Sequence, residues 1–523
     1  AAMAERGAGG RFEDDGLLAR LARLPANDTG NAARFIARFG LDFCFVRGLG
    51  WLAWDGRGWD EMEGERLAQV AAQETAAAIG REALMLEMVP DEAPGDFQDR
   101  QVKRWSFGRD SGNSGRINGC LLQAAPHLAI DIDDLDARPR LLAVANGTVA
   151  FLEAPKGHAV EPEECVRVDL VHRRADWLTH VCPVAYDAAA ECPAWLRFLE
   201  DVQPDPEVRR FIQRLVGYAL TGLNSEECLV AFEGKGANGK SLFIDVLEML
   251  LGSAAVGIDF ATLLADERRN GSGPTPDLAR LRGVRLVTAG EPERGAKLAE
   301  GRIKSITGGD KIVARQLNKA PFEFRATFQL LVSWNTRPRV GGDDGIWRRI
   351  LLLIWPVQIL PRGPDGRPNP KWERKEVMRA RFEAELSGIL NWALAGYADW
   401  AQGGLKPPAA VMQAVDSYRG QSDPVGSFVG DACETDDPTA SASAGDLYSA
   451  FQDWRRSFGW DGDFSQTRFG TALEERGFVA FKSGVIFRRG IRLRPEWRYG
   501  GEARRKPDAG DHGDPGPGAG DYP

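Results

Sequence analysis

The chain has 523 residues, of which 43% are hydrophobic and 27% are charged, and its formal net charge is −9. This length exceeds what one hydrophobic core supports, so about three domains are expected. The charge excludes a polycationic nucleic-acid-coating protein, so that any contact with DNA must use local basic patches. There is no apolar run of about eighteen residues and no signal-peptide pattern, which argues against a membrane-spanning or secreted protein.

Seven cysteines are scattered along the chain without a C-x-x-C pair, which favours reduced thiols in a cytoplasmic protein. A zinc site built from His180, Cys182 and Cys192 is an alternative, although the spacing of these residues fits neither a ribbon nor a finger.

The region before residue 201 divides into a flexible N-terminus, residues 1–26, and a mixed α+β domain, residues 27–200. In this domain, Trp51 to Trp59 predicts a hairpin that turns at Asp55-Gly56. Its three tryptophans could stack on bases, but a place in the hydrophobic core is the stronger interpretation.

Two further features precede residue 201. Asn146-Gly147 and the apolar residues after it predict another turn and strand. Asp131, Asp133 and Asp134 could imitate the metal-binding acids of a nucleotide polymerase, but an acidic stretch of this kind is more typical of a solvated loop.

The most specific motif is the eight-residue pattern G-x-x-x-x-G-K-[ST], which lies between a short apolar run, Cys228 to Glu233, and a helical pattern, Leu242 to Leu251. Strand, glycine-rich loop and helix are the context in which this pattern binds the phosphates of a nucleotide through backbone N–H groups. Lys240 should reach the β- and γ-phosphates of ATP, and the Ser241 hydroxyl should bind Mg²⁺. The predicted nucleotide-binding residues are Gly234, Lys235, Gly236, Ala237, Asn238, Gly239, Lys240 and Ser241.

Hydrolysis also needs an acid at the end of a neighbouring strand. Glu291, which follows the predicted strand Arg285 to Ala289, is the first candidate for holding Mg²⁺ and orienting water, and Glu293 is the second. Asn335 follows the predicted strand that ends at Trp334 and is suited to sense the γ-phosphate.

Arg348 and Arg349 precede another predicted strand, Ile350 to Trp355. One of them could act as an arginine finger on the nucleotide of a neighbouring subunit. Alternating residues near Phe322 and Phe324 predict a hairpin inserted between the acid and Asn335. The alternation of strands and helices indicates an α/β nucleotide-binding domain, with flanking helices, over residues 201–425.

The C-terminal part is expected to contain a linker at residues 426–445, a compact unit at 446–499 and a disordered tail at 500–523. Two helices followed by a ribbon that turns near Gly484 are the outline of a winged helix. From residue 464 to 499 there are eight basic and three acidic side chains, which favours a nucleic-acid face over a solvated structural face. The DNA-binding candidates in this unit are Arg468, Lys482, Arg488 and Arg489.

Taken together, these motifs resemble the phage- and plasmid-type primase–helicase family, whose motor is a superfamily-three helicase of the AAA+ class. The residues that carry the resemblance, which covers roughly residues 27–495, are Gly234 to Ser241, Gly290-Glu291, Lys304, Thr307 to Asp310, Ala314-Arg315, Asn335, Pro338, Trp347 to Arg349, Asn146-Gly147, Gly217-Tyr218, Phe469, Leu473 and Arg476 to Phe478.

The resemblance implies an α/β fold with an AAA+ P-loop ATPase core, a mixed α+β N-terminal region and a C-terminal winged helix. It implies a hexameric DNA helicase that uses ATP and Mg²⁺ in the cytoplasm of a bacterial host, with a separate primase or polymerase as a further partner. DNA would pass through the ring and meet Asn318 and Lys319 at the tip of the inserted hairpin. A solvent-exposed loop is the alternative for Lys319.

Gly290 stands where many such motors have a second acid, so the choice between Glu291 and Glu293 stays open. Two other functions also stay open: a bifunctional primase–helicase, and an ATP-dependent origin-binding or loading protein that does not unwind DNA.

Overall fold

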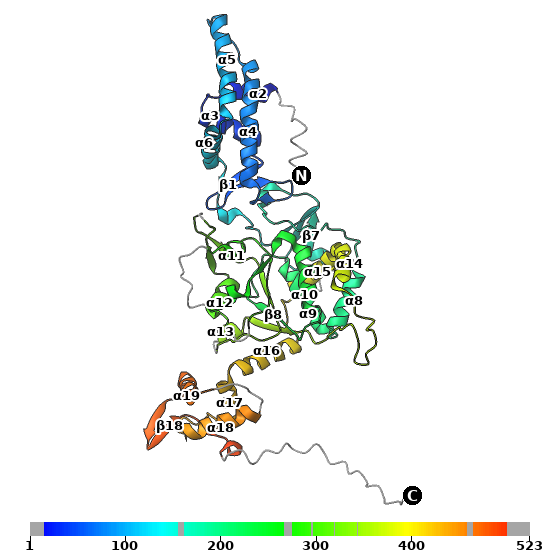
Figure 1. Cartoon of the computed structure of the whole chain (residues 1–523), viewed down its shortest axis with the longest axis vertical. Helices are drawn as coiled ribbons and strands as arrows, with labels where there is room; N and C mark the ends of the chain where they lie inside the picture. The colour runs from blue at the N-terminus through cyan, green and yellow to red at the C-terminus, as the bar shows by residue number, and fades with distance from the viewer. Residues whose placement is uncertain are drawn as a thin grey trace, which may run out of the picture. The chain divides into compact units, whose positions relative to one another are not determined.

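The computed structural model describes residues 15–154, 162–265, 275–293, 296–317, 320–341, 344–457 and 464–498 (Figure 1). The chain divides into two compact units, residues 1–415 and 416–523. The expected tail, residues 500–523, lies outside the described residues, as do residues 1–14 of the expected flexible N-terminus. The rest of that N-terminus does not match the expectation, because residues 15–22 form a helix that buries Leu18 and Leu21.

The first unit begins with a helical bundle beside a small sheet of strand order β3-β2-β1-β4. Asn27 caps the helix α3 by accepting a hydrogen bond from the Gly30 amide at 2.8 Å. The core of this part contains Phe35, Phe43 and Trp51. The elements are α2 (Asp15–Ala22), α3 (Asp28–Phe39), β1 (Phe43–Val46), β2 (Gly50–Trp54), β3 (Trp59–Asp60), α4 (Gly64–Glu82), α5 (Pro94–Ser111), α6 (Ser114–Ala124) and β4 (Ala129–Ile130).

The predicted hairpin of β2 and β3 is confirmed, with Asp55 and Gly56 in its turn. Trp51, Trp54 and Trp59 are at most 6% exposed, so they belong to the core and do not form a stacking surface for bases. The core interpretation of these tryptophans is therefore confirmed.

The next segment forms an antiparallel sheet of strand order β5-β6-β7 and two helices. Val144 pairs with Gly147 across the predicted Asn146-Gly147 turn, which confirms that turn and its strand. The elements are β5 (Leu141–Val144), β6 (Gly147–Phe151), α7 (Pro162–Cys165), β7 (Val166–Asp169), α8 (Pro193–Val202) and α9 (Pro206–Ala219).

A five-stranded sheet of order β14-β8-β13-β10-β9 forms the centre of the first unit, and all of its strand pairs are parallel. Side chains of α8, α9, α10 and α15 form one buried cluster with β8 and β14, and Figure 1 shows these helices together on one side of β8. The strands that the sequence predicts in this region, β8, β10, β13 and β14, are all confirmed. The elements are β8 (Leu229–Glu233), α10 (Lys240–Leu251), β9 (Ala255–Ile258), α11 (Pro276–Ala279), β10 (Leu286–Ala289), α12 (Glu300–Thr307), β13 (Gln329–Trp334), α13 (Asp344–Trp347) and β14 (Ile350–Ile354).

The predicted inserted hairpin is also present. Its strands β11 (Lys311–Ala314) and β12 (Phe322–Arg325) pair in antiparallel register between β10 and β13 in the chain. After β14 the chain runs without helix or strand to α14 (Lys375–Ala384), α15 (Leu386–Ala401) and α16 (Ala409–Ser422), the last of which crosses the boundary between the units.

The second unit includes residues 426–445, so the linker expectation for this segment is wrong. The small polar residues of this segment misled the prediction, because Phe428 and Cys433 are buried in the core of the unit. A three-stranded sheet of order β16-β18-β17 covers the helices, and Gly484 turns the ribbon at φ +74°. The elements are α17 (Pro424–Ala432), β15 (Cys433–Glu434), β16 (Ser441–Ser443), α18 (Ala444–Ser457), α19 (Gln466–Glu475), β17 (Ala480–Ser483), β18 (Val485–Arg489) and β19 (Arg492–Leu493).

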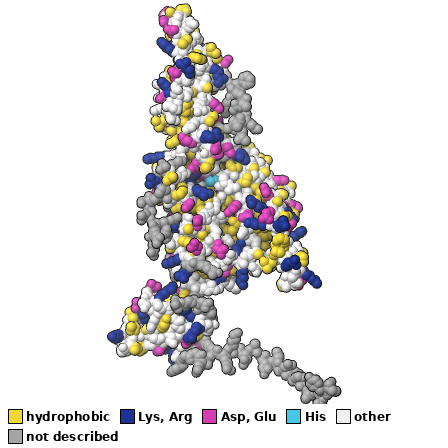
Figure 2. Space-filling model, viewed as in Figure 1, with side chains coloured by type: hydrophobic (Ala, Val, Ile, Leu, Met, Phe, Trp, Pro, Cys, Tyr) yellow, Lys and Arg dark blue, Asp and Glu magenta, His cyan; other side chains and the backbone are white. Residues whose placement is uncertain are grey.

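Basic and acidic side chains are interspersed over the visible surface of the first unit (Figure 2), as the balanced composition suggests. In the described parts of the chain, no helix combines the length and the apolar content that crossing a bilayer requires.

Candidate nucleotide-binding site

The glycine-rich loop connects the carboxyl end of β8 to the amino end of α10, as the sequence predicts. Gly239 has φ +85°, a left-handed conformation, and a Cβ at this position would lie 2.9 Å from Phe198 and Val202. At Gly234 a Cβ would lie 1.9 Å from the Asn238 side chain. These two positions therefore require glycine, which explains the spacing of the motif.

Lys240 is buried at the start of α10, and its ammonium group donates three hydrogen bonds. The acceptors are the Gly234 carbonyl at 2.9 Å, Asn335 Oδ1 at 3.1 Å and Asn238 Oδ1 at 3.3 Å. Burial lowers the pKa of Lys240, and the carboxylates of Glu291 and Glu233 oppose this shift. The ammonium group thus lies where phosphate oxygens could replace neutral acceptors.

Asn335 links Lys240 to Glu291. Its Nδ2 donates to Glu291 Oε2 at 2.9 Å, and its backbone N–H donates to Glu291 Oε1 at 3.3 Å. Asn335 follows β13 and Glu291 follows β10, and these neighbouring parallel strands end at the same edge of the sheet. That edge is where open α/β sheets bind ligands.

The structure brings Glu291, but not Glu293, to the loop. A cavity of about 690 Å³ lies against the loop and is lined by Lys240, Ser241, Glu291 and Asn335, whereas Glu293 is exposed and does not line it. The Ser241 hydroxyl and the Glu291 carboxylate provide oxygen ligands on this one cavity. They fit Mg²⁺, which proteins typically bind through one or two side chains together with substrate phosphates.

Arg348 and Arg349 lie at the opposite edge of the sheet. β14 pairs with β8 so that Ile350 is opposite Leu229, which places both arginines before the amino end of the sheet. Arg349 forms an ion pair with Glu227 at 2.7 Å and donates to the Gly345 carbonyl at 3.1 Å, while Arg348 is exposed. Neither arginine lines the cavity beside its own loop.

The candidate DNA-binding residues fall into three groups. Asn318 and Lys319 lie outside the described residues, between β11 and β12. Arg468, Lys482 and Arg489 are exposed on the second unit. These two groups remain predictions.

The structure contradicts the prediction that Arg488 binds DNA. It is buried, and it donates to Glu474 Oε1 at 2.7 Å and to the Phe478 carbonyl at 3.2 Å. Because Arg488 is buried and its Nη1 forms this ion pair between β18 and α19, it holds the ribbon on the helix and is not exposed to a DNA ligand.

The zinc alternative finds no support, since the described residues contain no group of three or more His, Cys, Asp or Glu side chains that could hold a metal. His180 Nε2 instead contacts the Arg282 carbonyl at 3.0 Å. Asp131 and Asp134 form a capping box around a short helical turn, which accounts for both acids structurally.

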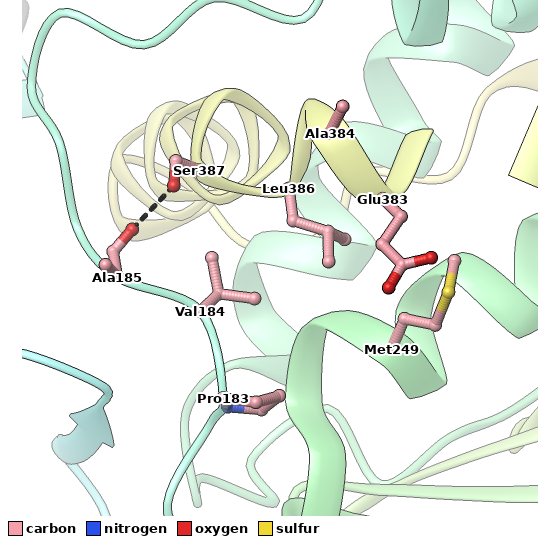
Figure 3. A pocket seen from close by; sticks show the side chains of 8 residues that line it. All are labelled: Pro183, Val184, Ala185, Met249, Glu383, Ala384, Leu386 and Ser387. Carbon is pink, nitrogen blue, oxygen red and sulfur yellow. Dashed lines mark hydrogen bonds between the residues drawn. The ribbon is translucent and has the colours of Figure 1, made fainter. Parts of the chain in front are cut away.

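A second cavity, of about 370 Å³, lies between α10 and the start of α15 (Figure 3). Val184, Met249 and Leu386 give it an apolar lining, and Ser387 donates to the Ala185 carbonyl at 2.8 Å. No cationic side chain that could bind phosphate is among the residues that line it, whereas Lys240 lines the larger cavity. The larger cavity is therefore the candidate nucleotide site.

Sequence reasoning missed the segment after β14. Gln358 Nε2 donates to the Gly236 carbonyl at 3.0 Å, and the Ile359 amide donates to the Ala237 carbonyl at 2.7 Å. Trp372, farther along this segment, lines the same cavity. The segment has no periodic pattern, so nothing in the sequence marks its contact with the loop.

Comparison with known proteins gives two family matches. The "D5 N terminal like" family matches residues 32–204, and a family of unknown function, DUF5906, matches residues 232–349.

Three curated viral proteins are similar to parts of the chain. "Putative helicase L207/L206" of Acanthamoeba polyphaga mimivirus is 30% identical over 272 residues, which is 50% of this chain and 28% of that protein. "Putative helicase 022R" of Frog virus 3 is 30% identical over 270 residues, or 50% of this chain and 27% of that protein. "Putative primase C962R" of African swine fever virus is 27% identical over 256 residues, or 47% and 25%. The chain thus spans about a quarter of the length of these relatives.

Among solved structures, the C-terminal region of NrS-1 aligns with 65% of this chain and 84% of its own, at 11% identity and a TM-score of 0.36. This likeness is too loose to add to the argument.

Proposed function

We propose that this chain, which belongs to the primase–helicase family, hydrolyses ATP to move along DNA and separate the DNA strands. The observation that carries this proposal is the contact chain from Lys240 through Asn335 to Glu291 beside the glycine-rich loop. A phosphate-binding lysine, a polar sensor and a carboxylate that can hold Mg²⁺ and orient water are the groups that ATP hydrolysis requires.

In this proposal the motor is a superfamily-three ATPase of the AAA+ class that works as a hexameric ring with ATP and Mg²⁺. The location of Arg348 and Arg349 supports a ring, because both arginines lie at the sheet edge away from their own loop. An arginine there would complete the site of an adjacent subunit.

DNA would contact the ring at two places. Asn318 and Lys319, between the strands of the inserted hairpin, would touch the phosphate backbone in the channel. In the second unit, the order of helices and strands and the exposed Arg468, Lys482 and Arg489 support a DNA-binding winged helix. We place this activity in replication of a phage, a plasmid or another mobile element, in the cytoplasm of a bacterial host.

The experiment that tests the proposal measures ATP hydrolysis with and without DNA, together with the unwinding of a forked duplex. We expect DNA to stimulate hydrolysis and ATP with Mg²⁺ to drive strand separation. Lys240→Ala should abolish both activities. A protein that forms rings and hydrolyses ATP but never separates strands would favour the origin-binding or loading alternative.

One relative is named a primase, which keeps a bifunctional primase–helicase as the second candidate. In the described residues the acids nearest to a polymerase pattern, Asp131 and Asp134, bond to the backbone of their own turn. We therefore assign primer synthesis to a separate primase or polymerase. Primer formation by this chain on a single-stranded template would reverse that assignment.

A further inference from the structure

Part of the cavity beside the glycine-rich loop is apolar. Its phosphate-binding part consists of Lys240, Ser241 and their polar neighbours. One wall of the cavity is formed by α8, the start of α14 and the segment between β14 and α14. The apolar side chains on this wall are Phe198, Val202, Ile359, Trp372 and Met378.

The segment that carries Trp372 is fixed to the loop. Gln358 donates to two loop carbonyls, those of Lys235 at 3.3 Å and Gly236 at 3.0 Å, and the Ile359 amide donates to a third carbonyl at 2.7 Å. A ligand held by the loop would therefore meet this wall in a defined position.

Trp372 has the largest aromatic ring among the residues that line this cavity, and it is 40% exposed. Charged groups near it are already paired, so they are poorly placed to read the edge of a base. These pairs are Lys371 with Asp201 at 2.6 Å, Lys375 with Asp245 at 2.6 Å and Glu373 with Arg381 at 2.9 Å.

We propose that Trp372 stacks on the base of the bound nucleoside triphosphate, and that the site consequently accepts GTP as well as ATP. Every base offers a π-face, so stacking by itself tolerates different bases. Recognition of one base would instead need hydrogen-bonding groups aimed at its edge. This inference rests on the proposed function, because it assigns the triphosphate to the same loop.

The test compares Trp372→Ala and Trp372→Phe with a matched control, Trp105→Ala. Trp105 lies on α5, is 57% exposed and does not line the cavity. We expect Trp372→Ala to raise KM for both ATP and GTP by about 5- to 150-fold, the range for loss of one stacked base, with kcat unchanged. Trp372→Phe should keep most of the affinity, and Trp105→Ala should behave like the wild type.

Inhibition by inorganic tripolyphosphate separates the base from the phosphates, and Trp372→Ala should leave it unchanged. An unchanged KM for ATP in Trp372→Ala would overturn the inference, as would a wild-type preference for ATP over GTP above about 100-fold, which indicates edge recognition.

Binding distinguishes failure of this inference from failure of the proposed function. If the wild type hydrolyses no nucleotide, the proposed function fails, but quenching of tryptophan fluorescence by ATP and GTP still reports stacking. That quenching should be lost in Trp372→Ala and kept in Trp105→Ala. Equal quenching in both variants would count against Trp372.

Discussion

The arginine pair before β14 gives the most decisive test of action between subunits. β14 and β8 run in parallel and in register from Ile350 opposite Leu229 to Ile354 opposite Glu233. At about 3.3 Å per residue, the length of these strands, about 13 Å, separates the arginines from the start of their own glycine-rich loop. Removal of the arginine that acts as the finger should therefore slow hydrolysis of the nucleotide bound to a neighbouring subunit.

The size of the effect follows from the geometry of a ring. Loss of an arginine finger lowers kcat by about 10³-fold or more. When Arg348→Ala and Lys240→Ala subunits are mixed equally, a site is active only if its own subunit has Lys240 and its neighbour has Arg348. In a random mixture about a quarter of the interfaces meet this condition, so about a quarter of the wild-type rate should return.

The assay is steady-state ATP hydrolysis across a series of mixing ratios, with each variant alone as the baseline. We expect recovery with Arg348→Ala, because Arg348 is exposed, and the same series with Arg349→Ala tests the second arginine. Failure to recover at every ratio, for both arginines, would refute action in trans and leave the pair with a structural role.

The remaining predictions concern stability, DNA binding and pH. Arg34→Ala should lower the free energy of unfolding by about 3–5 kcal/mol, because it removes the nearest cation from the buried Glu82 carboxylate and leaves only longer contacts to Arg104 at 3.4 Å and Arg38 at 3.8 Å. Arg66→Ala, in an exposed pair, should lower it by less than about 1 kcal/mol in the same denaturant titration. Arg489→Ala should weaken DNA binding and reduce the slope of log K against log salt by about 1, whereas Arg488→Ala should mainly lower the melting temperature. Burial lowers the pKa of Lys240, so the ammonium group loses its charge as the pH rises, before 10.5 is reached. ATP binding measured by fluorescence should therefore weaken on the alkaline side at a pH lower than 10.5. Binding that stays constant up to that pH would contradict this reasoning.

The elements that the sequence predicts best are those in which local pattern and tertiary environment agree. A buried parallel strand reads as a continuous apolar run, as in Leu229 to Phe232. The glycines at 236 and 239 after it mark positions where the backbone is left-handed. Turns such as Asp55-Gly56 are equally local, because they depend on residues that accept a left-handed backbone.

The residues that were misjudged depend on distant neighbours. Arg488 and Arg489 are adjacent and chemically identical, yet only Arg488 forms an ion pair with Glu474. Composition therefore cannot show that Arg488 is structural while Arg489 stays a candidate for DNA binding. Phe428 is buried although the residues that follow its helix read as a linker. The contact of Trp372 with the nucleotide cavity depends on the course of a segment that has no periodicity.

The same dependence on distant contacts explains why the residues before the loop cannot be treated as an independent module. Arg282, just before β10, forms a buried ion pair at 3.0 Å with Asp136 and a partly buried one at 3.0 Å with Glu61, and both acids come from the N-terminal region. Glu61 also accepts a hydrogen bond at 3.0 Å from Gln316, which lies between β11 and β12 of the inserted hairpin. Glu61 therefore contacts both the inserted hairpin and the segment that leads into β10, the strand that Glu291 follows. Buried charges of this kind are held only by their partners, so the N-terminal region is part of the structure that positions the motor.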